Sequence, residues 1–171
     1  MTVAVETGLW QLDASASTVA LRHKTLWGLV TVKGAFTGVA SKGEVRPDGS
    51  ATGTLTLEVA SLDTKNPKRD AHLRSADHFD ADNFPEITFV ARNVELGDDN
   101  AAHIVGQLTV RGVSRPLSFI ARLVDSNAEA LTLEGEFTVD RHQFGVSGNQ
   151  LGMIRGLTTV ETTLRFRRAT S

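Results

Sequence analysis

The sequence contains no cysteine, which excludes disulfide bonds, thiolate nucleophiles and cysteine-ligated zinc sites. It also lacks any run of eighteen apolar residues, about the length that a membrane-spanning helix needs. Neither sign of charge is in large excess, because the chain has 18 Lys and Arg and 20 Asp and Glu, which gives a net charge of −2. Nucleic-acid binders usually carry a basic patch or stripe. We therefore expect a chain that spans no membrane and binds no nucleic acid.

Targeting and domain signals are equally scarce. The opening MTVAVETGLWQLD has neither the basic n-region nor the apolar run of a secretion signal, so a cytoplasmic location is expected. The length of 171 residues suits one domain with a substantial core. Since no repeat, linker or change of composition divides the chain, we expect a single domain over residues 1–171.

The usual catalytic motifs are missing as well. Ser147 lies in FGVSGNQ, which is not the GxSxG of a nucleophile elbow, and neither GxxxxGK[ST] nor GxGxxG occurs. The strand acids Glu58, Glu134 and Glu136 fall at outward positions, whereas glycoside hydrolysis needs two carboxyl groups in one cleft. The sequence therefore predicts no enzyme and no cofactor.

The sequence does show period-two alternation of apolar and polar residues over most of its length. In ITFVARNV, for example, Ile87, Phe89 and Ala91 share one face. The same pattern recurs in residues 52–59, 116–124 and 131–139 and near both ends of the chain. Turn signals such as Pro47-Asp48-Gly49 separate the segments. A strand with one buried face and one solvent-exposed face is typical of antiparallel sheets. About eight such strands predict an all-β barrel or sandwich.

Four glycines, at positions 34, 53, 106 and 135, fall among the inward-facing apolar residues. Missing side chains at inward positions either leave room inside a barrel or let strands bend sharply. Because four occur together, we expect them to leave room for a cavity.

One segment is predicted to be helical. Asn66 is suited to cap a helix whose first residue is Pro67, and the pattern extends it over about residues 67–75. A long polar loop follows, up to Pro85, and long loops of this kind often cover a barrel mouth or carry function.

The charged stretch RDAHLRSADHFDADNF, residues 69–84, admits two interpretations. A metal-dependent hydrolase or isomerase would use His72, His78 and Asp70. However, His72 and His78 would lie on opposite sides of a helix, and no known ligand spacing occurs. We favour a structural motif in which polar pairing by Arg69, Asp70, His72 and Arg74 fixes the helix and loop to the strands.

Within and around this stretch the sequence resembles the signature of the YceI-like family. The matching residues are Leu62-Asp63-Thr64, Arg69-Asp70, His72-Leu73-Arg74-Ser75, Phe79, Pro85 and Phe89. Further matches are Trp10, Asp13, His23, Gly34, Phe36, Gly106, Leu108, Thr109, Gly112, Pro116, Arg141, Phe144 and Gly145. The chain departs from the family pattern at Ala16, where a His is common, and at Gln143, which replaces an acid.

The resemblance implies a lipocalin-like antiparallel β-barrel that holds a long isoprenoid or similar lipid in an elongated apolar cavity. No catalytic activity is established for the family as a class. We therefore predict non-enzymatic binding, storage or transport of a long-chain isoprenoid-type lipid, and a homodimer is a possible assembly. The alternative of a structural or stress-associated interaction module would require a filled barrel.

The candidate ligand contacts are inward-facing strand residues together with residues expected near the mouth. They are His23, Trp27, Val30, Val32, Phe36, Leu57, Phe79, Phe84, Phe89, Leu108, Phe119, Phe137, Phe144 and Phe166. His23 falls inward by its spacing from Val19 and Leu21, and it is interpreted either as a core residue or as a donor to a polar head group.

Overall fold

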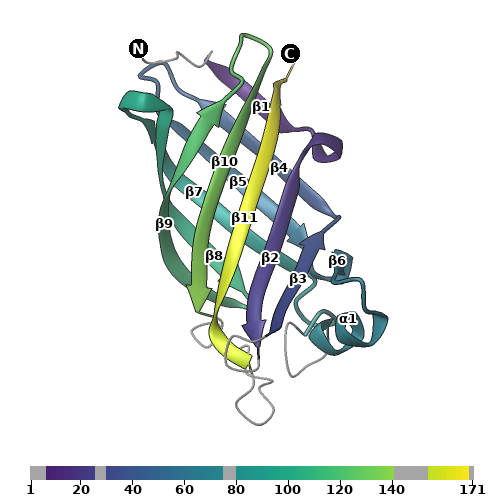
Figure 1. The fold of residues 1–171 in the computed structure, drawn as a ribbon. Helices are drawn as coiled ribbons and strands as arrows, with labels where there is room; N and C mark the ends of the chain where they lie inside the picture. Colours follow the sequence, from purple (N-terminus) through teal and green to yellow (C-terminus); the bar gives the residue numbers. More distant parts are fainter. Residues whose placement is uncertain (1–6, 26–29, 75–79, 141–153, 170–171) are drawn as a thin grey trace.

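The computed structural model describes residues 7–25, 30–74, 80–140 and 154–169, and Figure 1 shows a β-barrel with a helix at its side. The strands are β1 (Gly8–Leu12), β2 (Thr18–Thr25), β3 (Val30–Phe36), β4 (Val39–Val45), β5 (Ala51–Glu58), β6 (Leu62–Asp63), β7 (Glu86–Leu96), β8 (Ala101–Val110), β9 (Val113–Val124), β10 (Ala130–Asp140) and β11 (Ile154–Arg168). The helices are α1 (Pro67–Arg74) and three short 3-10 helices, η1 (Ala14–Ala16), η3 (Val59–Ser61) and η4 (Asp98–Asn100).

Within the described ranges, eight strands form a closed ring. Their order is β1-β4-β5-β7-β8-β9-β10-β11, and β1 closes the ring by pairing with both β4 and β11. Trp10 of β1 lies opposite Gly43 on one side and Arg168 on the other, and both pairings are antiparallel. The prediction of an antiparallel barrel of about eight strands is confirmed.

The remaining three strands extend from one edge of β11. β1 pairs with residues 166–168 of β11, whereas β2 pairs with residues 154–163. β3 pairs with β2, and the two-residue strand β6 pairs with β3. As Figure 1 shows, this branch places α1 beside β3 and β6 at the lower end of the barrel, away from the upper end where β1 and the last residues of β11 lie.

The helix is joined to β6 through a buried carboxylate. Its first turn begins at Pro67, and the Asp70 backbone N–H donates to the Asn66 carbonyl oxygen at 2.9 Å. The Asp70 side chain, buried at 7% exposure, accepts hydrogen bonds from the Thr64 backbone N–H and hydroxyl. The side chains of Arg69, His72 and Arg74 lie outside the described residues, so their part in the expected motif stays a prediction.

The buried side chains form three separate clusters along the barrel. The upper cluster is Trp10, Val45, Leu123 and Leu131. The middle cluster is Ala91, Ala102, Ile104 and Ala121. The lower cluster is Val19, Phe36, Leu57, Val59, Leu62, Ile87, Leu108, Val110 and Val160. Partly buried side chains connect them: Leu96 and Leu133 pack against the upper and middle clusters, and Phe89 packs against the middle and lower ones.

Among the described residues, the structure has no helix of the length and apolarity that crossing a membrane requires.

Candidate functional site

A cavity of about 260 Å³ lies inside the barrel. Small-molecule pockets in proteins run from roughly 300 to 1,000 Å³, so this space is slightly smaller than the lower end of that range. Its lining is formed mainly by apolar side chains of the inward strand faces. They are Trp10, Val19, Leu21, Phe36, Val45, Ala51, Leu55, Leu57, Ile87, Phe89, Ala91, Val94, Leu96, Ala102, Ile104, Leu108, Val110, Phe119, Ala121, Leu123, Leu131, Leu133, Phe137, Val139, Val160, Leu164 and Phe166.

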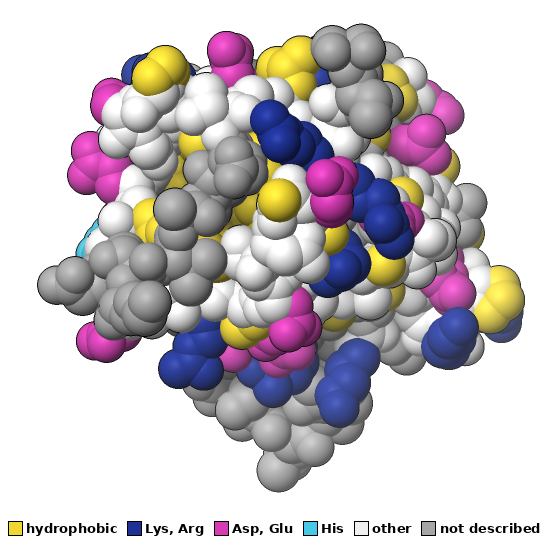
Figure 2. Space-filling view, turned by 90° about the horizontal axis from the view of Figure 1, so that it is seen from above, with side chains coloured by type: hydrophobic (Ala, Val, Ile, Leu, Met, Phe, Trp, Pro, Cys, Tyr) yellow, Lys and Arg dark blue, Asp and Glu magenta, His cyan; other side chains and the backbone are white. Residues whose placement is uncertain are grey.

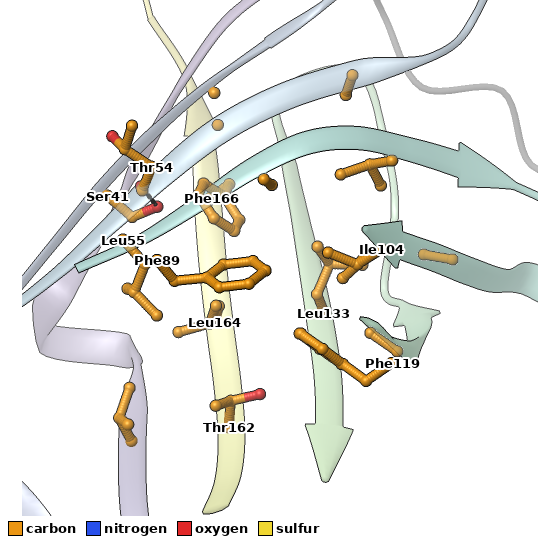
Figure 3. Close-up of a pocket in the computed structure, with 18 of the residues that line it drawn as sticks. Ser41, Thr54, Leu55, Phe89, Ile104, Phe119, Leu133, Thr162, Leu164 and Phe166 are labelled. Atoms are coloured by element: carbon orange, nitrogen blue, oxygen red, sulfur yellow. Dashed lines mark hydrogen bonds between the residues drawn. The ribbon is translucent and has the colours of Figure 1, made fainter. Parts of the chain in front are cut away.

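Several large apolar side chains face inward and are nevertheless only half-buried. Phe89, Phe119, Leu133, Leu164 and Phe166 belong to this group. Figure 3 shows these five side chains pointing from β7, β9, β10 and β11 into one shared space. Because they line the cavity, their accessible surface faces the interior of the barrel. Apolar surface that no side chain covers is the kind of surface that an apolar ligand buries favourably.

Three aromatic rings from three different strands contact one another in the cavity wall. The ring centroids of Phe119 and Phe137 are 4.6 Å apart, and those of Phe89 and Phe119 are 5.8 Å apart. Both pairs are tilted, at 30° and 52° respectively, and both separations are ordinary for rings in contact. The rings therefore form one continuous aromatic surface.

Polar side chains are a minority in the lining, and two of their hydroxyls donate to backbone carbonyls. The Ser41 hydroxyl donates to the Thr54 carbonyl oxygen, and Figure 3 marks this bond. The Thr162 hydroxyl donates to the Gly135 carbonyl oxygen at 3.2 Å. The charged lining residues Lys42 and Glu44 occupy exposed positions of β4. The cavity thus suits an apolar chain better than a charged group, because burying an unpaired charge is costly.

The upper end of the barrel is seen from above in Figure 2. Charged side chains of both signs are spread around this end, and hydrophobic side chains are visible in a hollow among them. The cavity lining reaches this end through Trp10, Val45 and Gly49 of the β4–β5 turn. The hydrophobic interior therefore continues to the end at which β1 and β11 meet.

The inward glycines do not all leave empty space. A Cβ atom at position 34 would lie 2.9 Å from the Thr64 methyl carbon, since β6 packs there. At position 106 it would lie 2.6 Å from Phe89 Cζ, and at position 135 it would lie 3.3 Å from Phe119 Cε2. At position 53 it would lie 3.1 Å from the Lys42 carbonyl oxygen and 3.4 Å from Gly43 Cα. The cavity exists, but a Cβ at any of the four positions would lie closer than ordinary packing distance to a neighbouring atom, so these glycines serve close packing of the strands.

Seven of the predicted contact residues line the cavity: Phe36, Leu57, Phe89, Leu108, Phe119, Phe137 and Phe166. Their contact with a ligand stays a prediction. Phe84 is not in the lining, because its ring packs against Gly112 at the β8–β9 turn, where a Cβ would lie 2.8 Å from Phe84 Cε1. Trp27, Phe79 and Phe144 and the side chains of His23, Val30 and Val32 lie outside the described residues.

Several lining residues were missed by the sequence prediction. Leu133 of β10 lies between Thr132 and Glu134, so the same period-two signal was available for it. Ile104 of β8 is followed by the apolar Val105, which weakens that signal. Trp10 was noted only as a family match, and its position in β1 depends on pairing with both β4 and β11. Ser41 carried no apolar signal at all.

The alternative of a metal site finds no support in the described part of the chain, which contains no group of three or more His, Asp or Glu side chains placed to hold an ion. Asp70, one of the proposed ligands, accepts both hydrogen bonds from Thr64 instead. The side chains of His72 and His78 lie outside the described residues.

Comparisons with known proteins place the chain among relatives of the same architecture. A family model described as the YceI-like domain matches residues 10–167. A UPF0312 protein of Staphylococcus aureus strain USA300 is 31% identical over 148 residues, which cover 81% of this chain and 82% of the relative.

Two solved structures share the fold. BcnA of Burkholderia cenocepacia superposes with a TM-score of 0.82 at 22% identity, covering 93% of this chain and 99% of that one. A polyisoprenoid-binding domain from Saccharophagus degradans, implicated in plant cell wall breakdown, superposes with a TM-score of 0.77 at 15% identity, covering 96% and 100%. At these identities the two structures establish the fold alone.

Proposed function

The chain belongs to the YceI-like family, and from this membership and the cavity we propose that it binds a long-chain isoprenoid-type lipid inside the barrel. It stores or transports this lipid without catalysing a reaction on it. The cytoplasmic location and the homodimer considered from the sequence stay predictions.

One observation carries the proposal: large apolar side chains face inward and keep accessible surface inside the barrel. Phe89, Phe119 and Phe166 are the clearest cases. A chain of methylene and methyl groups would cover this surface, at about 0.8 kcal/mol per buried methylene. About ten such groups offset much of the roughly 4–15 kcal/mol that association costs.

Two further observations support an apolar ligand. The hydroxyls of Ser41 and Thr162 already donate to backbone carbonyls, so these two groups do not need a hydrogen-bond acceptor on the ligand. A structural neighbour of this chain is described as a polyisoprenoid-binding domain. A ligand-free interaction module accounts less well for a cavity of about 260 Å³, because packed interiors rarely leave such space.

The proposal is tested on the purified full-length chain. Native mass spectrometry and solvent extraction should recover a co-purified lipid, and added geranylgeraniol should raise the melting temperature in proportion to the logarithm of its concentration. Recovery of the added alcohol unchanged after prolonged incubation tests the absence of catalysis. The proposal would be contradicted if the purified protein carried no lipid and if no added prenyl lipid changed its melting temperature.

A further inference from the structure

We propose that Phe119, together with Phe89 and Phe137, sets the bore of the cavity and therefore the longest apolar chain that the barrel accepts. The inference rests on the proposed lipid-binding function and adds the residues that determine its selectivity. The protein would then select its ligands by chain length and cross-section.

The position of the rings along the barrel is the first argument. Phe89 packs against both the lower and the middle cluster of buried residues, Phe119 against the middle one and Phe137 against the lower one. The three rings therefore lie at the boundary between the middle and lower parts of the interior. A chain too long for one part has to extend past them.

The packing of the rings on one another is the second argument. Centroid separations of 4.6 Å and 5.8 Å are contact distances, so no chain passes between the rings. A ligand has to pass beside them, through the space into which Phe89, Leu133 and Leu164 point in Figure 3. The width of this passage depends on how far the rings project from the wall.

Two glycines determine that projection. Phe119 Cε2 lies 3.3 Å from where a Cβ at position 135 would stand, and Phe89 Cζ lies 2.6 Å from where one at position 106 would stand. Each ring is thus recessed against the backbone of a neighbouring strand. A methyl group at position 135 would lie 3.2 Å from Thr162 Oγ1 and 3.3 Å from Phe119 Cε2, both closer than ordinary packing distance. The Thr162 hydroxyl and the Phe119 ring would each shift by a few tenths of an ångström, the ring towards the cavity.

Substitutions at Phe119 and at Gly135 should therefore change the width of the passage in opposite directions. Phe119→Ala removes a ring and widens the passage, and Phe119→Leu widens it less while disturbing the fold less. Gly135→Ala narrows it. Ile120→Ala is the matched control, because Ile120 is the next residue of the same strand but points outward and is 59% exposed.

The experiment measures the affinity of each variant for farnesol, geranylgeraniol and longer all-trans prenyl alcohols, by displacement of a fluorescent apolar probe and by native mass spectrometry. We expect the wild type to show a longest accepted chain. Phe119→Ala should bind the first excluded alcohol at least tenfold more tightly than the wild type does, with Phe119→Leu intermediate. Gly135→Ala should weaken binding of the longest accepted alcohol at least tenfold, and Ile120→Ala should change neither value.

The outcomes separate the two proposals. If the wild type binds prenyl alcohols but folded Phe119→Leu and Gly135→Ala keep its length limit, the rings do not set the bore and lipid binding stands. If the wild type binds no prenyl alcohol of any length, the proposed function fails and this inference fails with it. Thermal melting of each variant establishes that it is folded before its affinity is compared.

Discussion

The Asp70 carboxylate accepts two hydrogen bonds from Thr64, one from its backbone N–H at 2.9 Å and one from its hydroxyl at 2.6 Å. Both residues are buried, at 7% and 8% exposure. The pair joins α1 to the end of β6 and thus to the barrel. The charged stretch that looks like a candidate metal site in the sequence therefore supplies, through Asp70, a structural connection.

Replacing Asp70 should destabilise the fold because Thr64 would keep two buried donors without an acceptor. A buried donor left unsatisfied costs about 1–3 kcal/mol, so Asp70→Ala should lower the free energy of unfolding by at least about that amount. Urea unfolding followed by circular dichroism measures the change. Asp63→Ala is the control, since the Asp63 side chain is 43% exposed and pairs with Lys65 at the surface, and exposed pairs contribute less than about 1 kcal/mol. Equal losses in the two variants would contradict the structural role of Asp70.

The pH dependence of stability should include a contribution from Asp13. The hydrogen bond from the Ser15 hydroxyl, followed by that from Arg167 Nε at 3.0 Å, lowers the pKa of Asp13 below its ordinary value of 3.8. A carboxyl whose folded pKa is lowered stabilises the fold above its unfolded pKa, and this stabilisation is lost as the pH falls through the folded pKa. Wild type should therefore melt above Asp13→Asn at neutral pH, and the difference should shrink as the pH falls below 3.8 and close only below the lowered pKa of folded Asp13.

Thermal melts of both proteins over a series of acidic buffers provide the measurement. Added salt should shrink the difference, because the Arg167 side chain is 63% exposed and its attraction to Asp13 is screened. Glu134→Gln, on the outer face of β10, serves as the control for loss of a charge. A difference that persists unchanged into strong acid would show that Asp13 acts through packing and not through its charge.

The Phe89 ring and Gly106 give a third prediction. A Cβ at position 106 would collide with the Val90 carbonyl oxygen and lie 2.6 Å from Phe89 Cζ. Gly106→Ala should therefore cost at least about 1–3 kcal/mol, as overpacking does elsewhere. Adding Phe89→Leu should restore only part of the loss, since the collision with the backbone oxygen remains. A Gly106→Ala protein that melts like the wild type would mean that β7 and β8 shift apart freely at this point.

The inward faces of the long strands follow from the sequence because a pleated strand turns alternate side chains to opposite faces. Phe89, Phe119 and Phe137 were placed in this way, and the structure puts all three in the cavity wall. The alternation fails where the backbone departs from it. In β7 a register shift between Ala91 and Asn93 changes the parity, so that Val94 becomes inward.

Other features depend on partners that are distant in the sequence. β4 has Ser41 and Gly43 at inward positions, so no apolar alternation marks it as part of the barrel. The closure of the ring by β1 depends on simultaneous pairing with β4 and β11. The inward glycines also could not be interpreted fully from the sequence. Their spacing identifies inward positions, but it does not show that Phe89 packs against Gly106 and Phe119 against Gly135.

Filling the cavity should separate ligand binding from stability. Leu133 lies inward on β10, is half-buried, and packs against both the upper and the middle cluster. In Leu133→Trp the larger side chain should occupy space that is open to a ligand, so the melting temperature should hold or rise while affinity for geranylgeraniol falls at least tenfold, about 1.4 kcal/mol. Glu134→Trp makes the same substitution at the next, outward position and should leave affinity unchanged. If Leu133→Trp binds as the wild type does, the ligand lies elsewhere; if it unfolds, the interior at this level has no room for the added atoms.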